Sequence, residues 1–349
     1  MGCWLLALRK FAERAKRGKQ DKILVSFGAH GSRRDVKKFS RIIANHKGLF
    51  VDEAANVRTI GDAKARKRQL EYYAKKGNWA DYISKRKGAQ NNLVFESEII
   101  KLYREKRGKI SYAEIMPRTA RIKMKSLEAR EKELALKFSS LILEGKIDSS
   151  LLVFNDYFEV LAGQHKLRNK AISRNLSRMK GNVVARYGTV HSTFFRDLKR
   201  LRPEASRVFE TQTIFSPFNS LLREKVVGRA KPPSGRKLIG ALIDLIAIPS
   251  GRIMESLEVS GNDPRIWLFS QCLVSHPYEV LKRIVISHQK PKDVESFKKN
   301  IFSGILSASG LPENFMDLGK MQKFSLMKGL AERVAGKNSK IYQLAYGFE

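Results

Sequence analysis

The stretch ILVSFGAHGSRRDVKKFSRIIANHKGLFV, residues 23–51, decides the fold class of this chain. Residues 23–27 form a short, mostly apolar run that is followed by glycine, which is typical of a buried strand. Apolar residues then recur at helical spacing over residues 32–46, where Ser32 is placed to cap the helix. Residues 49–51 form a second apolar run. A strand, a helix and a strand within about thirty residues predict parallel strands with helices packed against the sheet.

The same alternation of helix and strand continues to about residue 210. Further strand candidates occur at residues 110–113, 182–186 and 207–210, and a segment with a helical pattern precedes each of them. Residues 211–236 are rich in proline, glycine and basic residues, which is typical of a linker. We therefore expect an α/β fold with a mainly parallel sheet flanked by helices, built from two similar halves, and then an α-helical C-terminal region.

This pattern divides the chain into four expected parts. A basic N-terminal helix is expected at residues 1–20, and the α/β core is expected at residues 21–210. The linker at residues 211–236 then leads to the α-helical C-terminal region at residues 237–349. A chain of 349 residues is long enough for about two domains that each bury a core.

The composition limits the class of protein. The 349 residues include 68 Lys and Arg against 34 Asp and Glu, a net charge of +34. A hydrophobic content of 42% excludes a disordered chain. The two cysteines, Cys3 and Cys272, exclude a disulfide framework and a four-cysteine zinc site, so we expect a reducing, cytoplasmic environment. The longest nearly apolar run, residues 238–249, is shorter than the roughly 20 residues that span a bilayer, so no transmembrane segment is expected.

Two histidines and two glutamates follow predicted strands. His30 and His191 each come after a strand and a glycine-containing turn, and a serine follows within two residues, Ser32 and Ser192. Glu53 follows the second strand, and Glu114 follows the strand at residues 110–113. Ligands bind at the carboxyl ends of parallel strands, and imidazole and carboxylate groups with one open position describe a catalytic transition-metal site. A single loop histidine is more often a structural residue, so it is the repeated pattern that favours a site.

These residues resemble the superfamily of TraB, Tiki and erythromycin esterase. The superfamily has two histidine motifs of the form G-x-x-H, an E-x-x-x-x-R element and an Arg-Asp or Arg-Asn pair. The matching segments of this chain are GAH at residues 28–30, EAANVR at 53–58, RN at 168–169 and GTVH at 188–191. The first motif is shortened to G-x-H here. The resemblance covers about residues 21–210.

The resemblance to the Tiki branch implies a metal-dependent hydrolase that cleaves an amide or ester bond in a peptide or ester substrate. His30, Glu53 and His191 would bind a divalent ion such as manganese, cobalt or zinc. Such an ion lowers the pKa of a bound water toward neutrality, and this water would be the nucleophile.

The same resemblance implies roles for three charged residues around that ion. Glu114 would take the proton of the water as general base. Arg58 or Arg168 would stabilise the oxyanion of the tetrahedral intermediate. The alternative interpretation of Glu53, Arg58 and Arg168 is a structural network that supports the edge of the sheet.

The basic charge favours a second class of function, a nucleic-acid or ribonucleoprotein binding protein whose α/β part is a noncatalytic scaffold. Its expected contacts are residues 85–87, the helix at 168–180 and the basic residues at 229–237. The basic clusters are spread along the sequence, and no zinc finger, KH loop or P-loop is present. A net charge of +34 predicts at least nonspecific binding to nucleic acid or an anionic surface through counterion release.

Overall fold

The computed structural model describes residues 22–28, 39–43, 48–53, 57–76, 109–209, 215–228, 233–259, 263–287 and 294–347. The chain divides into two compact units. Unit 1 comprises Met1–Ile122 and Lys166–Gln212, and unit 2 comprises Lys123–His165 and Thr213–Glu349. The predicted boundary at residue 210 is close to one of these limits, whereas the grouping of residues 123–165 with the C-terminal helices was not expected.

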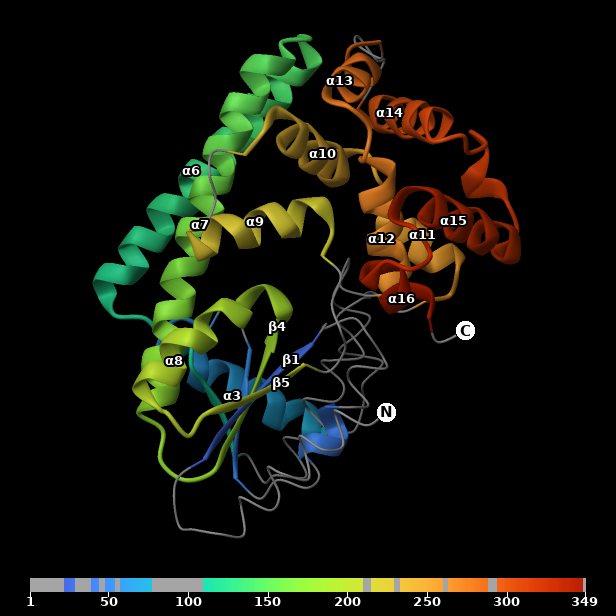
Figure 1. Ribbon diagram of the computed structural model, residues 1–349. Coiled ribbons are helices and arrows are strands. Elements are labelled where there is room, and N and C mark those ends of the chain that lie inside the picture. The colour runs from blue at the N-terminus through green and yellow to red at the C-terminus, as the bar shows by residue number, and fades with distance from the viewer. Residues whose placement is uncertain are drawn as a thin grey trace. The chain divides into compact units, whose positions relative to one another are not determined.

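Unit 1 is built on a five-stranded, all-parallel sheet with the strand order β3-β2-β4-β1-β5 (Figure 1). Its strands are β1 (Ile23–Gly28), β2 (Leu49–Asp52), β3 (Ile110–Tyr112), β4 (Val183–Gly188) and β5 (Ser206–Phe209). The register of the central pair runs from Ile23 opposite Val183 to Gly28 opposite Gly188. The structure thus confirms the predicted parallel α/β fold.

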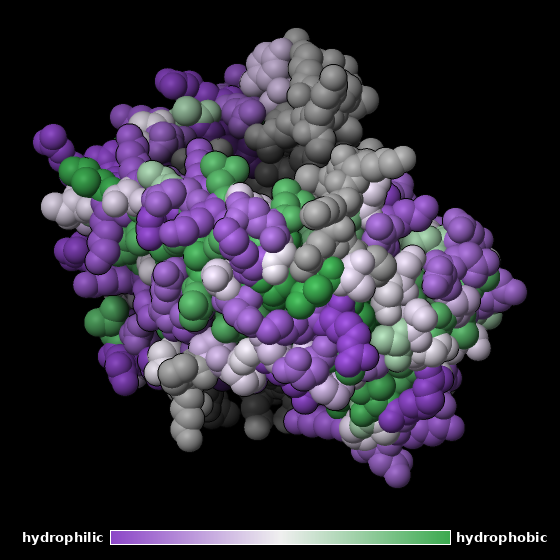
Figure 2. Space-filling view, turned by 90° about the horizontal axis from the view of Figure 1, so that it is seen from above, coloured by the Kyte–Doolittle hydropathy of each residue, from purple (hydrophilic) through white to green (hydrophobic). Residues whose placement is uncertain are grey.

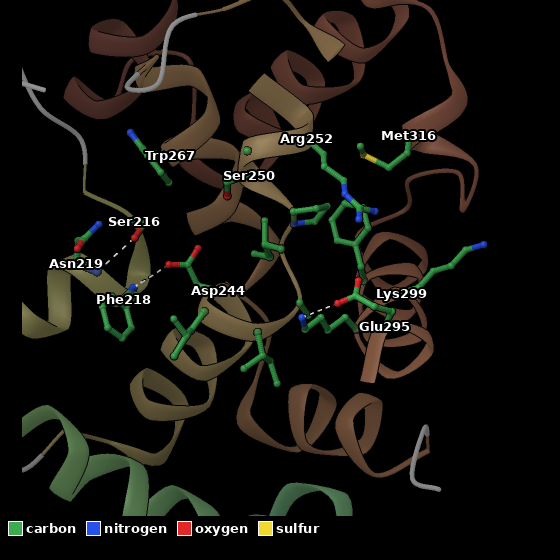
Figure 3. Close-up of a pocket in the computed structure, with 18 of the residues that line it drawn as sticks. Ser216, Phe218, Asn219, Asp244, Ser250, Arg252, Trp267, Glu295, Lys299 and Met316 are labelled. Atoms are coloured by element: carbon green, nitrogen blue, oxygen red, sulfur yellow. Dashed lines mark hydrogen bonds and ion pairs between the residues drawn. The ribbon is translucent and has the colours of Figure 1, made fainter. Parts of the chain in front are cut away.

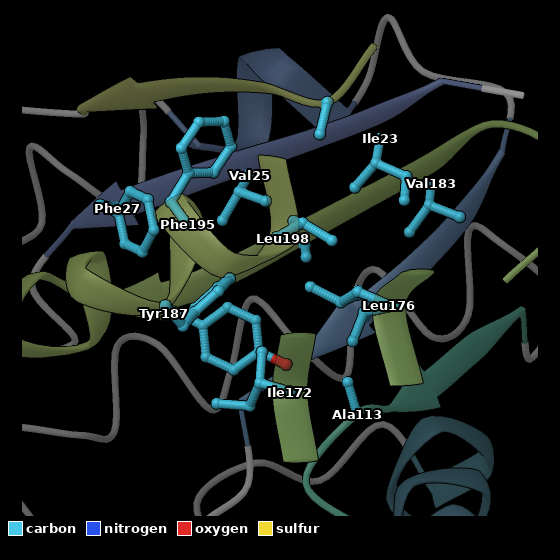
Figure 4. Packing of buried hydrophobic residues seen from close by; sticks show 14 residues of the cluster. Ile23, Val25, Phe27, Ala113, Ile172, Leu176, Val183, Tyr187, Phe195 and Leu198 are labelled. Carbon is cyan, nitrogen blue, oxygen red and sulfur yellow. The ribbon is translucent and has the colours of Figure 1, made fainter. Parts of the chain in front are cut away.

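Strand β1, which lies between β4 and β5, is buried along its whole length. Its odd-numbered residues Ile23, Val25 and Phe27 contribute to one apolar cluster, which Figure 4 shows from close by. Leu24 contributes to a second cluster together with Phe50 of β2. Because apolar residues are needed on both faces of a covered parallel strand, the run is nearly continuous, and Ser26 is its one polar residue.

Helices cover both faces of the sheet. Helix α3 (Ile60–Lys76) contributes Leu70 to the cluster that contains Leu24. Helix α8 (Phe195–Leu201) contributes Leu198 to the cluster around Phe27. A 3-10 helix, Thr189–Phe194, joins β4 to α8, so His191 lies within a helical turn and not in the open loop that the sequence predicted.

Helices α6 (Arg118–Leu143) and α7 (Ile147–Ser177) have most of their length in unit 2. The sequence pattern predicts two separate segments, residues 151–163 and a basic helix at residues 164–180, where α7 is one continuous helix. Gly163 lies at the junction of those segments, and a Cβ there would lie 3.4 Å from Leu127 of α6. This distance is an ordinary van der Waals contact, so Gly163 lies where α6 packs against α7, and it does not end α7.

The remaining helices belong to unit 2. They are α9 (Pro217–Val227), α10 (Gly235–Ile246), α11 (Ser250–Ser256), α12 (Pro264–Leu273), α13 (Tyr278–Ser287), α14 (Val294–Ala308), a 3-10 turn (Phe315–Asp317), α15 (Lys320–Ala335) and α16 (Lys340–Tyr346). The structure thus confirms the predicted α-helical C-terminal region.

The predicted linker at residues 211–236 contains helix α9. Ser216 accepts a hydrogen bond from the backbone of Asn219 as an N-cap, Pro217 begins the helix, and Gly228 ends it with a φ of 69°. Proline at the first helical position and glycine just past the last are signals of helix ends. The same residue types that suggested a linker therefore mark the two ends of a helix.

In the part of the chain that the structure describes, no helix combines the length and the apolar character needed to cross a membrane. Figure 2 shows hydrophilic side chains over most of the visible face, with hydrophobic side chains in smaller groups between them.

Candidate active site

Residues that follow three neighbouring strands meet in unit 1. Glu53 comes directly after β2, Glu114 comes two residues after β3, and His191 comes three residues after β4. Because β3, β2 and β4 are adjacent and parallel, their carboxyl ends lie at the same edge of the sheet. The side chains of all three residues belong to one network, in which Arg168 of α7 is the central cation.

Arg168 joins the two glutamates. Its Nε donates to Glu114 Oε2 at 2.8 Å, and its Nη2 donates to Glu114 Oε1 at 3.1 Å and to Glu53 Oε1 at 3.3 Å. The side chain of Glu114 is 1% exposed and that of Arg168 is 15% exposed. Two nitrogens of the guanidinium group therefore hold Glu114 in the paired geometry that gives a strong charge-assisted interaction.

The second oxygen of Glu53 is held by the backbone. Gly188 donates its N–H to Glu53 Oε2 at 2.5 Å, at the last residue of β4. This bond fixes Glu53 beside the turn that carries His191. The glycine of the G-x-x-H motif thus contributes a backbone donor to the site in addition to ending the strand.

Asn169 orients His191. Asn169 Nδ2 donates to Thr193 Oγ1 at 2.7 Å, so its Oδ1 is the acceptor that faces His191 Nδ1 at 2.8 Å. The Nδ1 proton of His191 then donates to Asn169, and Nε2 faces Glu53 Oε1 at 3.4 Å. An imidazole held in this way by a neighbouring amide presents one defined nitrogen to a proton or a metal ion.

Burial and charge act in opposite directions on this network. Burial raises the pKa of Glu114 above its ordinary value, the Arg168 charge lowers it in part, and the negative charge of Glu53 raises it again. Burial alone would lower the pKa of Arg168, but the charges of Glu114 and Glu53 raise it above its ordinary value. Arg168 therefore stays charged, and it is the group that stabilises the carboxylate form of Glu114.

The Tyr187 hydroxyl lies close enough to these carboxylates for their negative charge to raise its pKa. Burial, followed by the charges of Glu114 and Glu53, raises the pKa of Tyr187 well above its ordinary value. The side chain is fully buried, and its hydroxyl makes no hydrogen bond to any described residue. The sequence did not predict this residue, because a tyrosine in a buried strand carries no signal beyond packing.

Replacing Tyr187 with phenylalanine is expected to raise the free energy of unfolding by about 1 kcal/mol. The change keeps the ring that packs on Phe194 at a centroid distance of 5.0 Å and removes a buried hydroxyl that has no partner among the described residues. Urea unfolding of both proteins measures the difference. A loss of stability of 1 kcal/mol or more would contradict the expectation.

Of the predicted site residues, the structure brings Glu53, Glu114, Arg168 and His191 into direct contact. The charge of Arg58 lowers the pKa of Glu114, so Arg58 lies near the same group. Its backbone also supports the site: the carbonyl accepts from Met116 at 2.9 Å, and the N–H donates to Asp62 at 3.0 Å.

The predicted ligand His30 lies outside the described residues. Two contacts of the site, those of Asn169 and Thr193, went unpredicted, although the Arg-Asn pair marked the position of the first. Thr193 could not be predicted, because a hydroxyl residue shortly after a histidine occurs equally in an ordinary turn and in a turn whose hydroxyl bonds to the site.

The donor types and the spacing of His191 and Glu53 fit a transition-metal ion. Two ligands that each lie about 2.1 Å from a tetrahedral metal are about 3.4 Å apart, and the distance between His191 Nε2 and Glu53 Oε1 is 3.4 Å. No group of three His, Cys, Asp or Glu side chains among the described residues could hold a metal ion. A metal ion bound by His191 and Glu53 would need a third ligand from outside the described residues, which do not include His30.

Unit 2 contains a pocket of about 1030 Å³ between the end of α10, the start of α11, α12 and α14 (Figure 3). Asp244 in its lining accepts hydrogen bonds from the Phe218 backbone at 3.0 Å and the Ser270 hydroxyl at 2.5 Å, and burial raises its pKa. Glu295, the other acidic residue of the lining, pairs with Lys298 at 2.8 Å. No histidine or cysteine lines this pocket, so the network in unit 1 is the better candidate for an active site.

Comparison of the chain with protein-family models, with curated proteins and with solved structures finds no match. The fold and the site themselves define the class: an α/β protein with a parallel sheet and a buried histidine–carboxylate–arginine network. The resemblance to the superfamily of TraB, Tiki and erythromycin esterase stays a prediction from the motif residues.

Proposed function

We propose that unit 1 is a metal-dependent hydrolase of amide or ester bonds, related to the TraB and Tiki superfamily. The observation that supports this proposal best is the approach of His191 Nε2 to Glu53 Oε1 at 3.4 Å. A hydrogen bond to Asn169 holds His191 in place, and a hydrogen bond from the Gly188 backbone holds Glu53. His191, Glu53 and His30 would hold the divalent ion, either manganese, cobalt or zinc. The ion would supply a Lewis acid and a bound water of lowered pKa.

The other residues of the network have roles that follow from their contacts. Glu114 is the general base in this proposal, because burial raises its pKa toward the range where a carboxylate accepts a proton more readily. Arg168 keeps Glu114 and Glu53 in place through Nε and Nη2. Its Nη1 makes no hydrogen bond to a described residue, so this nitrogen is the proposed donor to an oxyanion, and Arg58 is the alternative.

Metal analysis of the purified full-length chain tests this proposal. After incubation with Mn²⁺, Co²⁺ or Zn²⁺ and removal of the free ion, we expect about one equivalent of bound metal by mass spectrometry. The Glu53→Gln and His191→Ala variants are expected to bind at least tenfold more weakly, because each removes a ligand. Hydrolysis of p-nitrophenyl acetate and of a fluorogenic peptide by the metal-loaded chain is the second readout.

Matched control variants lie in unit 2. Glu133→Gln removes a carboxylate that is 60% exposed, and His276→Ala removes an imidazole that bonds to Ser309. Both are expected to bind metal as the unchanged protein does. A chain that is folded by circular dichroism and binds no metal would overturn the proposal, and so would equal binding by all four variants.

A further inference from the structure

The positive charge of the chain is concentrated in one of its two units. Unit 1 contains 42 Lys and Arg against 15 Asp and Glu, a net charge of +27, whereas unit 2 contains 26 against 19, a net charge of +7. The basic clusters are spread along the sequence, but the division of the chain assigns most of the excess to unit 1. A binding surface for an anion is therefore to be sought there.

Four exposed cations form a row at the C-terminal end of α7. Lys166, Lys170 and Arg174 lie on the helix at intervals of four residues, and Arg178 continues the interval just after its last residue. Residues four apart lie on one face of a helix, about 6 Å apart along its axis. We call these four residues the α7 basic row. None of them forms an ion pair with a described carboxylate.

This row differs from the charged surface of unit 2, where lysines are paired with carboxylates on neighbouring turns or helices. Such pairs are Lys237 with Glu224, Lys282 with Asp148, Lys298 with Glu295 and Lys320 with Glu258. Like charges four residues apart on a helix repel each other. An anion bound along the α7 basic row would relieve this repulsion.

A second basic segment lies at the same end of α7. Arg202, just after α8, donates from Nη1 to the carbonyls of Ser177 at 3.1 Å and Met179 at 3.2 Å. Helix α8 adds the exposed side chains of Arg196 and Arg200; Arg200 is 73% exposed and lies 3.8 Å from the exposed carboxylate of Asp197. Over residues 166–209 the sequence has only two acidic residues, Asp197 and Glu204.

The surface composition distinguishes between possible anionic partners. Binding to a membrane surface needs an apolar helix face, but Ile172 and Leu176 of α7 are buried in the core of the sheet. Binding to single-stranded nucleic acid uses exposed aromatic side chains for stacking. Among the described residues 166–209, Phe209 is the one exposed aromatic side chain, at 38%. The backbone of a nucleic-acid duplex requires only cations at suitable spacing.

We propose that the α7 basic row, together with Arg196 and Arg200 of α8, binds the phosphate backbone of double-stranded nucleic acid without sequence preference. Its recognition is electrostatic, so DNA and RNA duplexes share the chemistry that it reads. The row is on the side of α7 opposite to Arg168 and Asn169, which turn toward the sheet. This binding is therefore independent of the proposed hydrolase.

Fluorescence anisotropy with the full chain tests the proposal. The probes are a labelled 24-base-pair DNA duplex, a second duplex of unrelated sequence and an RNA duplex of the first sequence, each titrated from 50 to 300 mM salt. Both DNA duplexes are expected to bind with equal affinity, and the logarithm of the affinity is expected to fall linearly with the logarithm of the salt concentration. A preference above tenfold for one DNA sequence would overturn the proposal. The RNA arm shows which duplex binds more tightly.

The variant K166Q/K170Q/R174Q/R178Q removes the row, and K123Q/K125Q/K132Q/K137Q removes four exposed lysines from α6 as a control of equal charge. Loss of four phosphate contacts is expected to reduce the salt slope by about 3 to 4 and to weaken binding at least tenfold, whereas the control changes binding less than threefold. Equal losses in the two variants would overturn the proposal, because net charge alone would then explain binding. Tighter binding to phosphatidylserine vesicles than to both kinds of duplex would also overturn it. Circular dichroism checks that both variants are folded.

Discussion

Replacing Arg168 with methionine is expected to lower the free energy of unfolding by about 3–5 kcal/mol at pH 7. The change removes the cation that pairs with Glu114 at 2.8 Å and with Glu53 at 3.3 Å, while it keeps most of the side chain's volume. Glu114 then remains buried without its counter-charge. Urea unfolding followed by circular dichroism measures the loss.

The stability lost in the Arg168→Met variant is expected to depend on pH and to be larger at higher pH. The pKa of Glu114 is raised in the folded state by burial, so the folded state holds this proton more tightly than the unfolded state. Stability from this group is therefore present at low pH and is lost as the pH rises through the raised pKa. Without Arg168 the pKa rises further, so the deficit is larger at pH 7 than at pH 5.

Two controls make the Arg168 prediction specific. Arg130→Met removes an exposed cation that pairs with Glu133 on α6 and is expected to cost less than 1 kcal/mol. The double variant Glu114→Gln/Arg168→Met removes the buried charge together with its partner and is expected to recover part of the loss at pH 7. An equal loss at pH 5 and pH 7 would contradict the assignment of Arg168 as the counter-charge of Glu114.

Replacing Phe158 with alanine is expected to destabilise unit 2 by about 3–5 kcal/mol. Its ring is fully buried and lies 4.9 Å from the rings of both Phe154 and Phe218, measured between centroids. The change leaves a cavity where α7 meets α9. Leu152→Ala on the same helix is the control, because Leu152 is 72% exposed and its loss is expected to cost about 0.5 kcal/mol or less. Urea unfolding that gives the two variants the same stability would contradict this account of the core.

The strands of the sheet could be predicted to within one or two residues. Residues 23–27 were predicted and β1 is Ile23–Gly28; residues 49–51 were predicted and β2 is Leu49–Asp52. Short apolar runs that end at glycine or at a charge leave little choice of boundary. The order of the strands could not be predicted, because it depends on how distant segments pair.

Helix boundaries were predicted less well where glycine and proline have more than one use. Gly163 suggested a break in α7, but it lies where α6 packs against that helix. Ser216 and Pro217 suggested a linker, but they begin α9. In both cases the deciding factor is a tertiary contact or a capping bond, and periodicity within a short window does not report either.

The meeting of Glu53, Glu114 and His191 could be predicted because residues that follow parallel strands share one edge. The pairing of Arg168 with both glutamates is different, since it depends on the rotation of α7 against the sheet. The Arg-Asn motif predicted that residues 168–169 matter, while the individual bonds to Glu114 and His191 required the structure.

The strand order has a consequence for synthesis of the chain on the ribosome. In the described sheet, β1 pairs with β4 and β5. Ile23 can therefore pair with Val183, and Leu24 with Ser206, only after those later residues have been synthesised. Contacts between segments so far apart in sequence close slowly, and until they form both edges of β1 offer unpaired backbone groups to other chains. A nascent chain that stops at residue 180 has made β1 but neither of the two strands that pair with it. The pairing of β1 is thus completed only when β4 and β5 have been made, and a chaperone that shields β1 during this interval would raise the yield of folded protein.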